Sequence, residues 1–346
     1  MSLTVERLRP KWLGAGIVFV IVAALLGVAV GAVSIAPHRA LLEILDHVPL
    51  VHVHSGLDAR EAAIVWDIRL PRVVLSLLVG SMLAIAGGSY QGAFRNPLAD
   101  PWLLGVAAGA GLGATLMIVS GASSGNSFGP LQLAAFGGAI SAVVLTYVLG
   151  VSAGQGRSPA ALILAGVAVS NFLTAIQTYL QQRHADTIRE VYSWVLGRLP
   201  AASWHDVGVL APYVVVTSTV LLAARRMLDV LAVGDDEATA LGLRVHQVRL
   251  VIVIAATLGT AAAVSVSGLI SFVGIIVPHT IRLLAGHSYR TILPLSLLFG
   301  AGFLALTDLL ARTLLQPAEI PIGVVTAFFG APFFLVVLRT NRTAAP

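Results

Sequence analysis

Long uncharged stretches alternate with short polar intervals along most of the chain. A helix needs roughly 20 apolar residues to cross the hydrocarbon core of a bilayer, so each long stretch predicts a membrane-spanning helix. We expect an all-α bundle, built as one transmembrane domain over residues 1–346, in which the eighth span continues past Arg282. The ten predicted spans are 12–37, 73–94, two within 101–156 with a break at 121–130, 158–182, 207–224, two within 250–281 that meet near 267–268, 291–307 and 322–338.

The composition agrees with a membrane protein. Hydrophobic residues make up 57% of the 346 residues and charged residues 11%, whereas about 25% of the residues of a soluble domain are charged. The absence of Cys excludes disulfides and Cys-ligated metals. The net charge of +5 is explained by the basic residues at the ends of spans, and we expect no nucleic-acid partner.

The distribution of basic residues predicts the orientation. Ten spans place both termini on one side of the membrane. Lys and Arg favour the cytoplasmic side, and most of the 21 Lys and Arg residues lie on the side of the termini. We therefore expect cytoplasmic termini, with the polar segment 225–249 also in the cytoplasm.

Segment 225–249 is the longest charged interval in the second half of the chain. We predict two short helices, at 227–233 and from Gly234 onward. The acids Asp235, Asp236 and Glu237 suit the N-terminus of the second helix because they complement its dipole. An amphipathic helix outside the bilayer favours a groove on a partner protein; the alternative is a solvated loop. The proposed contact residues are Gly234, Asp235, Ala238, Leu241, Gly242 and Leu243.

Several motifs, in the same order along the chain, resemble the FecCD-type permease subunits of bacterial ABC importers for iron chelates, haem and vitamin B12. They are RLPR at 69–72 followed by LLVGSMLAIAGGSYQG, RNPLADPWLLG at 95–105, LILAGVAVS at 162–170, the segment 234–243, SGLISFVGIIVPHTIRLLAG at 267–286 and EIPIGVVTAFFGAPFF at 319–334. The combination of RNPLADPxLLG with FVGxxxPHxxR is specific to that family.

The resemblance implies a type II ABC importer permease fold in the bacterial cytoplasmic (inner) membrane. It also implies a homodimer with a central pathway, two cytoplasmic ABC ATPase subunits, and an extracytoplasmic substrate-binding protein. In this family two short helices within 227–246 couple the permease to the ATPase. The chain has no GxxxxGK[ST] phosphate-binding loop, so ATP and Mg²⁺ are expected in the partner ATPase and no catalytic residue in this chain.

Three arginines are candidates for docking the binding protein: Arg69, Arg72 and Arg312. The resemblance implies that they meet glutamates of that protein, and Arg suits bidentate carboxylate pairs. The alternative is an interfacial arginine that anchors a helix end by snorkelling.

The fifth predicted span carries a polar stripe at helical spacing, formed by Asn171, Thr174, Thr178 and Gln181. A neutral polar wall could line the translocation pathway, while the alternative is hydrogen bonding between helices. The resemblance places a cytoplasmic gate just before this span, at Ser158, Pro159 and Ala160. Pro159 and Ala160 depart from the hydroxyl residues expected there, and a Pro-started helix N-terminus explains the segment equally well.

The remaining candidates are weaker. His38, His47, His52 and His54 lie in the first external segment, but no acidic residue completes a metal-site spacing, so we predict no metal site and leave contact with substrate open. We expect an iron–siderophore complex as cargo, followed by haem and cobalamin. The alternative function is a secondary transporter driven by an ion gradient, which needs an acid within a span; Asp308, near an outer end, is the one the spans offer.

Overall fold

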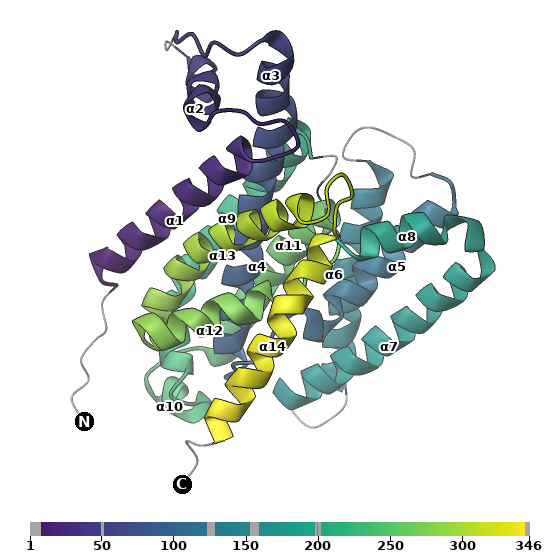
Figure 1. Ribbon diagram of the computed structural model, residues 1–346. Coiled ribbons are helices and arrows are strands. Elements are labelled where there is room, and N and C mark those ends of the chain that lie inside the picture. Colours follow the sequence, from purple (N-terminus) through teal and green to yellow (C-terminus); the bar gives the residue numbers. More distant parts are fainter. Residues whose placement is uncertain are drawn as a thin grey trace.

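A computed structural model describes residues 8–49, 52–122, 129–152, 159–197, 199 and 202–342. All regular elements in these residues are helical (Figure 1). Seven helices among the described residues have the length and apolar composition to cross a membrane, and three further apolar helices are shorter. The seven are α1 (Pro10–Ala29), the continuous helix Ala59–Ala93, α6 (Pro130–Ser152), α7 (Pro159–Arg183), α9 (Trp204–Leu231), α11 (Val245–Ser267) and α13 (Tyr289–Thr313). The shorter three are α5 (Val106–Val119), α12 (Val273–Ala285) and the segment Ile322–Leu335 of α14 (Ile322–Arg342).

The all-α membrane fold predicted from the sequence is confirmed, and so are its internal breaks. α5 ends at Val119 and α6 begins at Pro130, which matches the predicted break at 121–130. α11 ends at Ser267, and Gly268 follows with a φ of 69°, a left-handed conformation that glycine adopts readily. α12 then continues past Arg282 to Ala285.

The first predicted span was too long, and the second began too late. α1 ends at Ala29, and the apolar residues Val33 and Ile35 lie in a coil before α2 (Pro37–Asp46). The second long helix starts upstream of residue 73, with α3 (Ala59–Ala63), a π-helical segment η1 (Ile64–Arg69) and α4 (Leu70–Ala93) in direct succession. Its charged first turns concealed it in the hydropathy pattern, since they project beyond the bundle (Figure 1).

α4 forms the centre of the bundle, with most of its residues buried. It packs against α9, α11, α12 and α13. Its glycines allow close approach of backbones: a Cβ built on Gly87 would overlap the carbonyl oxygen of Gly274 in α12, and one on Gly80 would overlap that of Gly300 in α13. α7 covers the far side of α5 and α6 and is mostly exposed.

The connection from α4 to α5 returns into the bundle. Asp100 caps the 3₁₀ turn η2 (Pro101–Leu104) by accepting a hydrogen bond from the Trp102 N–H at 3.0 Å. The Asp100 carboxyl is 7% exposed. Burial raises its pKa to about 6, although the Trp102 N–H opposes that shift.

The two ends of the bundle differ in what they carry. α1 begins, α14 ends and the short helix α10 (Asp235–Ala240) lies at one end, and α2 and α3 lie at the other (Figure 1). We call these the α10 end and the α2 end.

Candidate functional site

The first of the two predicted coupling helices does not exist as a separate element. α9 runs without interruption to Leu231, so residues 227–231 are its last turn. The reason is packing: Leu228 and Leu231 are both fully buried against the core. Hence the segment 227–246 contains one separate short helix, α10, which is the second predicted helix.

A glycine with positive φ lies on each side of α10. Gly234 has a φ of 149° and Gly242 a φ of 84°, values that favour glycine. After α10 the Leu243 N–H donates to the Ala238 carbonyl at 3.0 Å and the Gly242 N–H to the Thr239 carbonyl at 2.9 Å, the pair of bonds of a Schellman C-cap. The three acids occupy the first turn as predicted.

Asp235 ties α10 to the bundle through ion pairs with Arg249 and, at 3.8 Å from its Nε, with Arg95. The Arg249 Nη2 of α11 donates to both Asp235 carboxylate oxygens, at 2.8 and 3.0 Å. The Arg249 Nε donates to the Ala93 carbonyl at the end of α4, at 2.8 Å. A single, largely buried guanidinium therefore joins α10, α11 and α4. The sequence indicated Asp235 but not Arg249, because nothing in the linear pattern separates this arginine from others near helix ends.

The predicted contact residues of α10 divide into two faces. Ala238 is fully buried and Leu243 packs partly against the core. Leu241 is 71% exposed and Val233 is 64% exposed. Leu241 and Val233 thus leave an apolar surface at the α10 end, which we call the α10 knob.

A second link joins α9 to α13 beside this segment. The Asp229 carboxylate of α9 accepts hydrogen bonds from the Ser288 hydroxyl at 2.9 Å and from the Tyr289 N–H at 2.5 Å. Its distance to the Arg290 Nε is 3.3 Å. Asp229 therefore caps the N-terminus of α13 from the last turn of α9, a contact that the sequence did not indicate.

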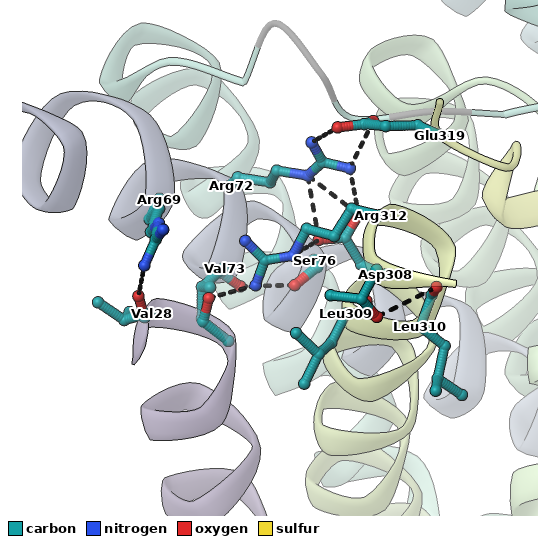
Figure 2. Close-up of polar contacts among 12 residues, drawn as sticks. Val28, Arg69, Arg72, Val73, Ser76, Asp308, Leu309, Leu310, Arg312 and Glu319 are labelled. Atoms are coloured by element: carbon teal, nitrogen blue, oxygen red, sulfur yellow. Dashed lines mark hydrogen bonds and ion pairs between the residues drawn. The ribbon is translucent and has the colours of Figure 1, made fainter. Parts of the chain in front are cut away.

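At the α2 end, Arg72 of α4 lies between two carboxylates (Figure 2). Its Nε and Nη2 donate to Asp308 of α13 at 2.9 to 3.1 Å, and its Nη1 and Nη2 donate to Glu319 at 2.9 and 3.0 Å. Asp308 has a side chain only 1% exposed, while that of Glu319 is 41% exposed. The Arg312 Nε lies 3.8 Å from Asp308. We call Arg72, Asp308, Arg312 and Glu319 the outer charge network.

The other two predicted docking arginines cap α1. The Arg69 Nη1 donates to the carbonyls of Val28 at 2.8 Å and Ala29 at 3.0 Å, and its Nη2 donates to that of Val33. The Arg312 Nη2 donates to the carbonyl of Gly27. Carbonyls in the last turn of a helix lack partners within it and carry its negative dipole end. The two guanidinium groups satisfy them.

The three arginines are therefore interior groups, with relative exposures of 4% for Arg69, 8% for Arg72 and 9% for Arg312. This does not match arginines freely displayed at the surface. It also differs from the snorkelling alternative, because each guanidinium is bound within the chain. Docking itself stays a prediction. The partners Asp308 and Glu319 were not recognised, although both lie within or close to the motifs at the C-terminal part of the chain.

The predicted polar stripe lies on the outward face of α7. Asn171, Thr174 and Thr178 are exposed and Gln181 is half-buried. The Asn171 amide donates to the Val167 carbonyl at 2.8 Å and the Thr178 hydroxyl to the Thr174 carbonyl at 2.9 Å. These two bonds stay within α7. The neighbouring Gln177, by contrast, is 9% exposed and faces Gly111 of α5.

The structure gives little information on the predicted gate at 158–160 and on the histidines of the first external segment. Ser158 lies outside the described residues, as do the side chains of Pro159 and Ala160, whose backbone starts α7. His47 stacks on Trp66 with ring centroids 3.7 Å apart. In the part of the chain that the structure describes, no three His, Cys, Asp or Glu residues form a group that could hold a metal ion.

Comparison with known proteins accords with this architecture. The model of the FecCD transport family matches residues 19–340. A cobalamin import system permease protein, BtuC, of Halobacterium salinarum is 43% identical over 84% of this chain and 77% of its own. A hemin transport system permease protein, HmuU, of Yersinia pestis is 35% identical over 97% and 98%, and an ABC transporter permease protein of Bacillus subtilis, YvrB, is 39% identical over 94% and 93%.

A solved structure described as an inward-facing conformation of a metal-chelate type ABC transporter has the same fold. Its chain superposes with a TM-score of 0.83 at 28% identity, covering 96% of this chain and all of its own. The family predicted from the motifs is thereby confirmed, and the relatives are permease proteins of import systems. From its motifs, its helical architecture and these matches, the chain is a multi-pass membrane protein that belongs to the FecCD transport family.

Proposed function

We propose that this chain is the permease subunit of an ATP-driven importer that crosses the bacterial inner membrane ten times, with both termini in the cytoplasm. It does no covalent chemistry. Two copies form the pathway, two ABC ATPase subunits bind ATP and Mg²⁺ on the cytoplasmic side, and an extracytoplasmic protein delivers the substrate. The family membership and the α10 end of the bundle support this assignment.

The α10 knob carries the proposal. Leu241 and Val233 expose apolar side chains next to a helix that is fixed on its other face. A partner groove that binds the knob would pull on α10, and Asp235 and Arg249 join α10 to α11 and to the end of α4. The Asp229 contacts connect the preceding segment to α13. Movement of a bound ATPase is thus transmitted to three spans through short polar contacts.

The exposed face of α7 supports a pathway shared by two copies. Asn171 and Thr178 each donate one hydrogen bond within α7, but the Asn171 amide has further polar capacity that lipid cannot satisfy. An exposed stripe of this kind therefore favours a polar or protein surface opposite it. A second copy with water and cargo between the two α7 helices provides one. In this arrangement the stripe forms a neutral wall, and residues 158–160 lie at its cytoplasmic end as the gate.

The binding protein is proposed to dock at the α2 end through Arg69, Arg72 and Arg312. Of these, Arg72 is in direct contact with a half-exposed carboxylate, that of Glu319. An incoming glutamate would therefore exchange with Glu319 on the same guanidinium. Docking then requires a small rearrangement of residues 314–321, and not merely surface contact.

The cargo is proposed to be a metal chelate, an iron–siderophore complex before haem or cobalamin. The relatives include permeases for cobalamin, hemin and iron(3+)-hydroxamate. The alternative of an ion-gradient-driven carrier needs an intramembrane acid available to a cation. Asp308 does not meet that need, since Arg72 and Arg312 both bind it.

The test replaces Leu241 by Asp in the assembled importer. Because Leu241 is 71% exposed, the substitution should leave folding nearly unchanged, yet it buries a charge in the ATPase groove. We expect ATPase binding to the permease and ATP-dependent uptake of the chelate to fall at least about tenfold, the effect of about 1.4 kcal/mol. The matched control is Leu315→Asp, 61% exposed at the α2 end, which should retain ATPase binding. Full binding and uptake with Leu241→Asp would refute the coupling role.

A further inference from the structure

An apolar cavity of about 130 Å³ lies between α1, α12 and α13. It is separate from the α10 knob, the outer charge network and the α7 stripe. Among its lining residues, the Thr280 hydroxyl and the Trp12 indole N–H are the polar side-chain groups. The lining includes Trp12 and Phe19 of α1, Thr280 and Leu284 of α12, and Leu295 and Phe299 of α13.

The cavity is elongated along α1. Trp12 and Phe19 are seven positions apart, which corresponds to about 10 Å along a helix. At the end away from Trp12 the ring of Phe19 stacks on that of Phe299, with centroids 5.5 Å apart. A slot of this length and polarity is unsuited to ordered water, which needs polar partners. It fits a hydrocarbon chain that enters from the end of α1.

The mouth of the slot is basic. Lys11 lies with its Nζ 5.6 Å from the centroid of the Trp12 ring that forms one wall. Arg9 precedes the helix, and both basic residues are exposed. The first turn of α1 has no acidic residue. An apolar slot with one cation against its wall and a second exposed cation at the N-cap of the same helix is complementary to a molecule with a hydrocarbon tail and an anionic head.

We propose that this slot binds one acyl chain of an anionic phospholipid, whose phosphate group is held by Lys11 and Arg9. The lipid would fill the space between α1 and the α12–α13 pair and fix the tilt of α1 near its start. The inference depends on the chain crossing a membrane but not on the proposed transport. A failed lipid test therefore leaves the Leu241 experiment unaffected, and a failed Leu241 experiment leaves the lipid site unaffected.

The test measures contact between Trp12 and lipid in the purified full-length protein. The protein in detergent micelles is titrated with phosphatidylglycerol or phosphatidylcholine that carries brominated acyl chains, which quench tryptophan on contact. The difference between the wild type and Trp12→Phe isolates the Trp12 signal. We expect quenching of Trp12 by phosphatidylglycerol at a roughly tenfold lower concentration than by phosphatidylcholine, because each basic residue near the headgroup adds to the attraction.

Two variants distinguish the slot from nonspecific lipid around the bundle. Arg9→Glu with Lys11→Glu changes exposed side chains only and should abolish the preference for phosphatidylglycerol. Thr280→Phe fills the slot and should remove Trp12 quenching by either lipid, whereas Arg60→Glu, an exposed basic residue at the α2 end, should change neither result. Equal quenching by both lipids in the wild type, or an unchanged preference in the Arg9/Lys11 variant, would show that Trp12 and Lys11 only anchor α1 at the interface.

Discussion

Replacing Asp308 by Asn should strongly destabilise the bundle. The Asp308 carboxylate has a side chain only 1% exposed and lies against two guanidinium groups, at 2.9 Å from Arg72 and 3.8 Å from Arg312. Removing one partner of a buried ion pair costs about 3–5 kcal/mol, since the other charge is left uncompensated. Glu319 still pairs with Arg72 after the change, so we expect the lower end of this range, about 3 kcal/mol.

That loss is a large part of the about 5–15 kcal/mol by which folded proteins are typically stable. Thermal unfolding of the purified permease in detergent micelles measures it. The entropy of unfolding is about 2.1 cal/mol/K per residue, so for 346 residues a loss of about 3 kcal/mol lowers Tm by about 4 °C. The matched control is Glu319→Gln. Because the Glu319 side chain is 41% exposed, its ion pair is screened, and its loss should cost about 1 kcal/mol or less.

A second variant tests the reason for the effect. Asp308→Leu combined with Arg72→Met removes both charges of the closest pair, but Arg312 then loses its carboxylate and Glu319 its arginine. The double variant should therefore still be destabilised, but by less than the sum of the two single variants, because neither ion of the closest pair is left buried without the other. An Asp308→Asn variant that unfolds at the wild-type temperature, or a Glu319→Gln variant that is less stable than Asp308→Asn, would show that burial does not set the strength of these ion pairs.

Two further predictions follow from the centre of the bundle. Gly87→Ala should destabilise the protein by about 1–3 kcal/mol or more, because the new Cβ overlaps the Gly274 carbonyl oxygen. The control is Gly137→Ala, where a Cβ meets nothing within 4 Å, and it should be neutral or stabilising by up to about 1 kcal/mol. Equal Tm values for the two variants would contradict the close α4–α12 contact. The Asp100 carboxyl has a pKa raised to about 6 from 3.8, so the folded state binds a proton that the unfolded state has released, and stability should fall as pH rises from about 4 to about 6 by at most about 3 kcal/mol. Asp100→Asn, compared with wild type across this range, should remove that part of the pH dependence and be the more stable protein at pH 7.5; parallel curves would contradict it.

The hydrophobic pattern predicted the helices well wherever a helix end coincides with a change in polarity. The breaks at 121–130 and at Ser267 are marked by polar residues and glycines, and the structure has both. The end of α1 is not marked in this way. Val33 and Ile35 are apolar, but they lie in a coil. The Val33 carbonyl accepts a hydrogen bond from Arg69, which belongs to another helix. A hydropathy pattern cannot show that these two residues meet.

For the candidate sites too, local features could be predicted from the sequence, but contacts between distant residues could not. Asp235, Gly234 and Gly242 could be recognised because their roles are local: a helix N-terminus and two backbone conformations that favour glycine. Arg72 was singled out as a docking residue, but its partners Asp308 and Glu319 are 236 and 247 positions away in the sequence. Which charges pair across such separations depends on the packing of α4 against α13, so an arginine that the motif suggested as a surface group is an interior one.

The position of α4 connects the two ends of the molecule. At one end its Ala93 carbonyl accepts the Arg249 guanidinium that also holds α10, and at the other its Arg72 binds Asp308 and Glu319. Arg72 and Ala93 are 21 positions apart on one regular helix, or about 30 Å. A buried helix packed on all sides moves as a rigid element, because close-packed interiors do not deform gradually. A shift of α10 that moves α4 would therefore change the contacts of Arg72 at the far end.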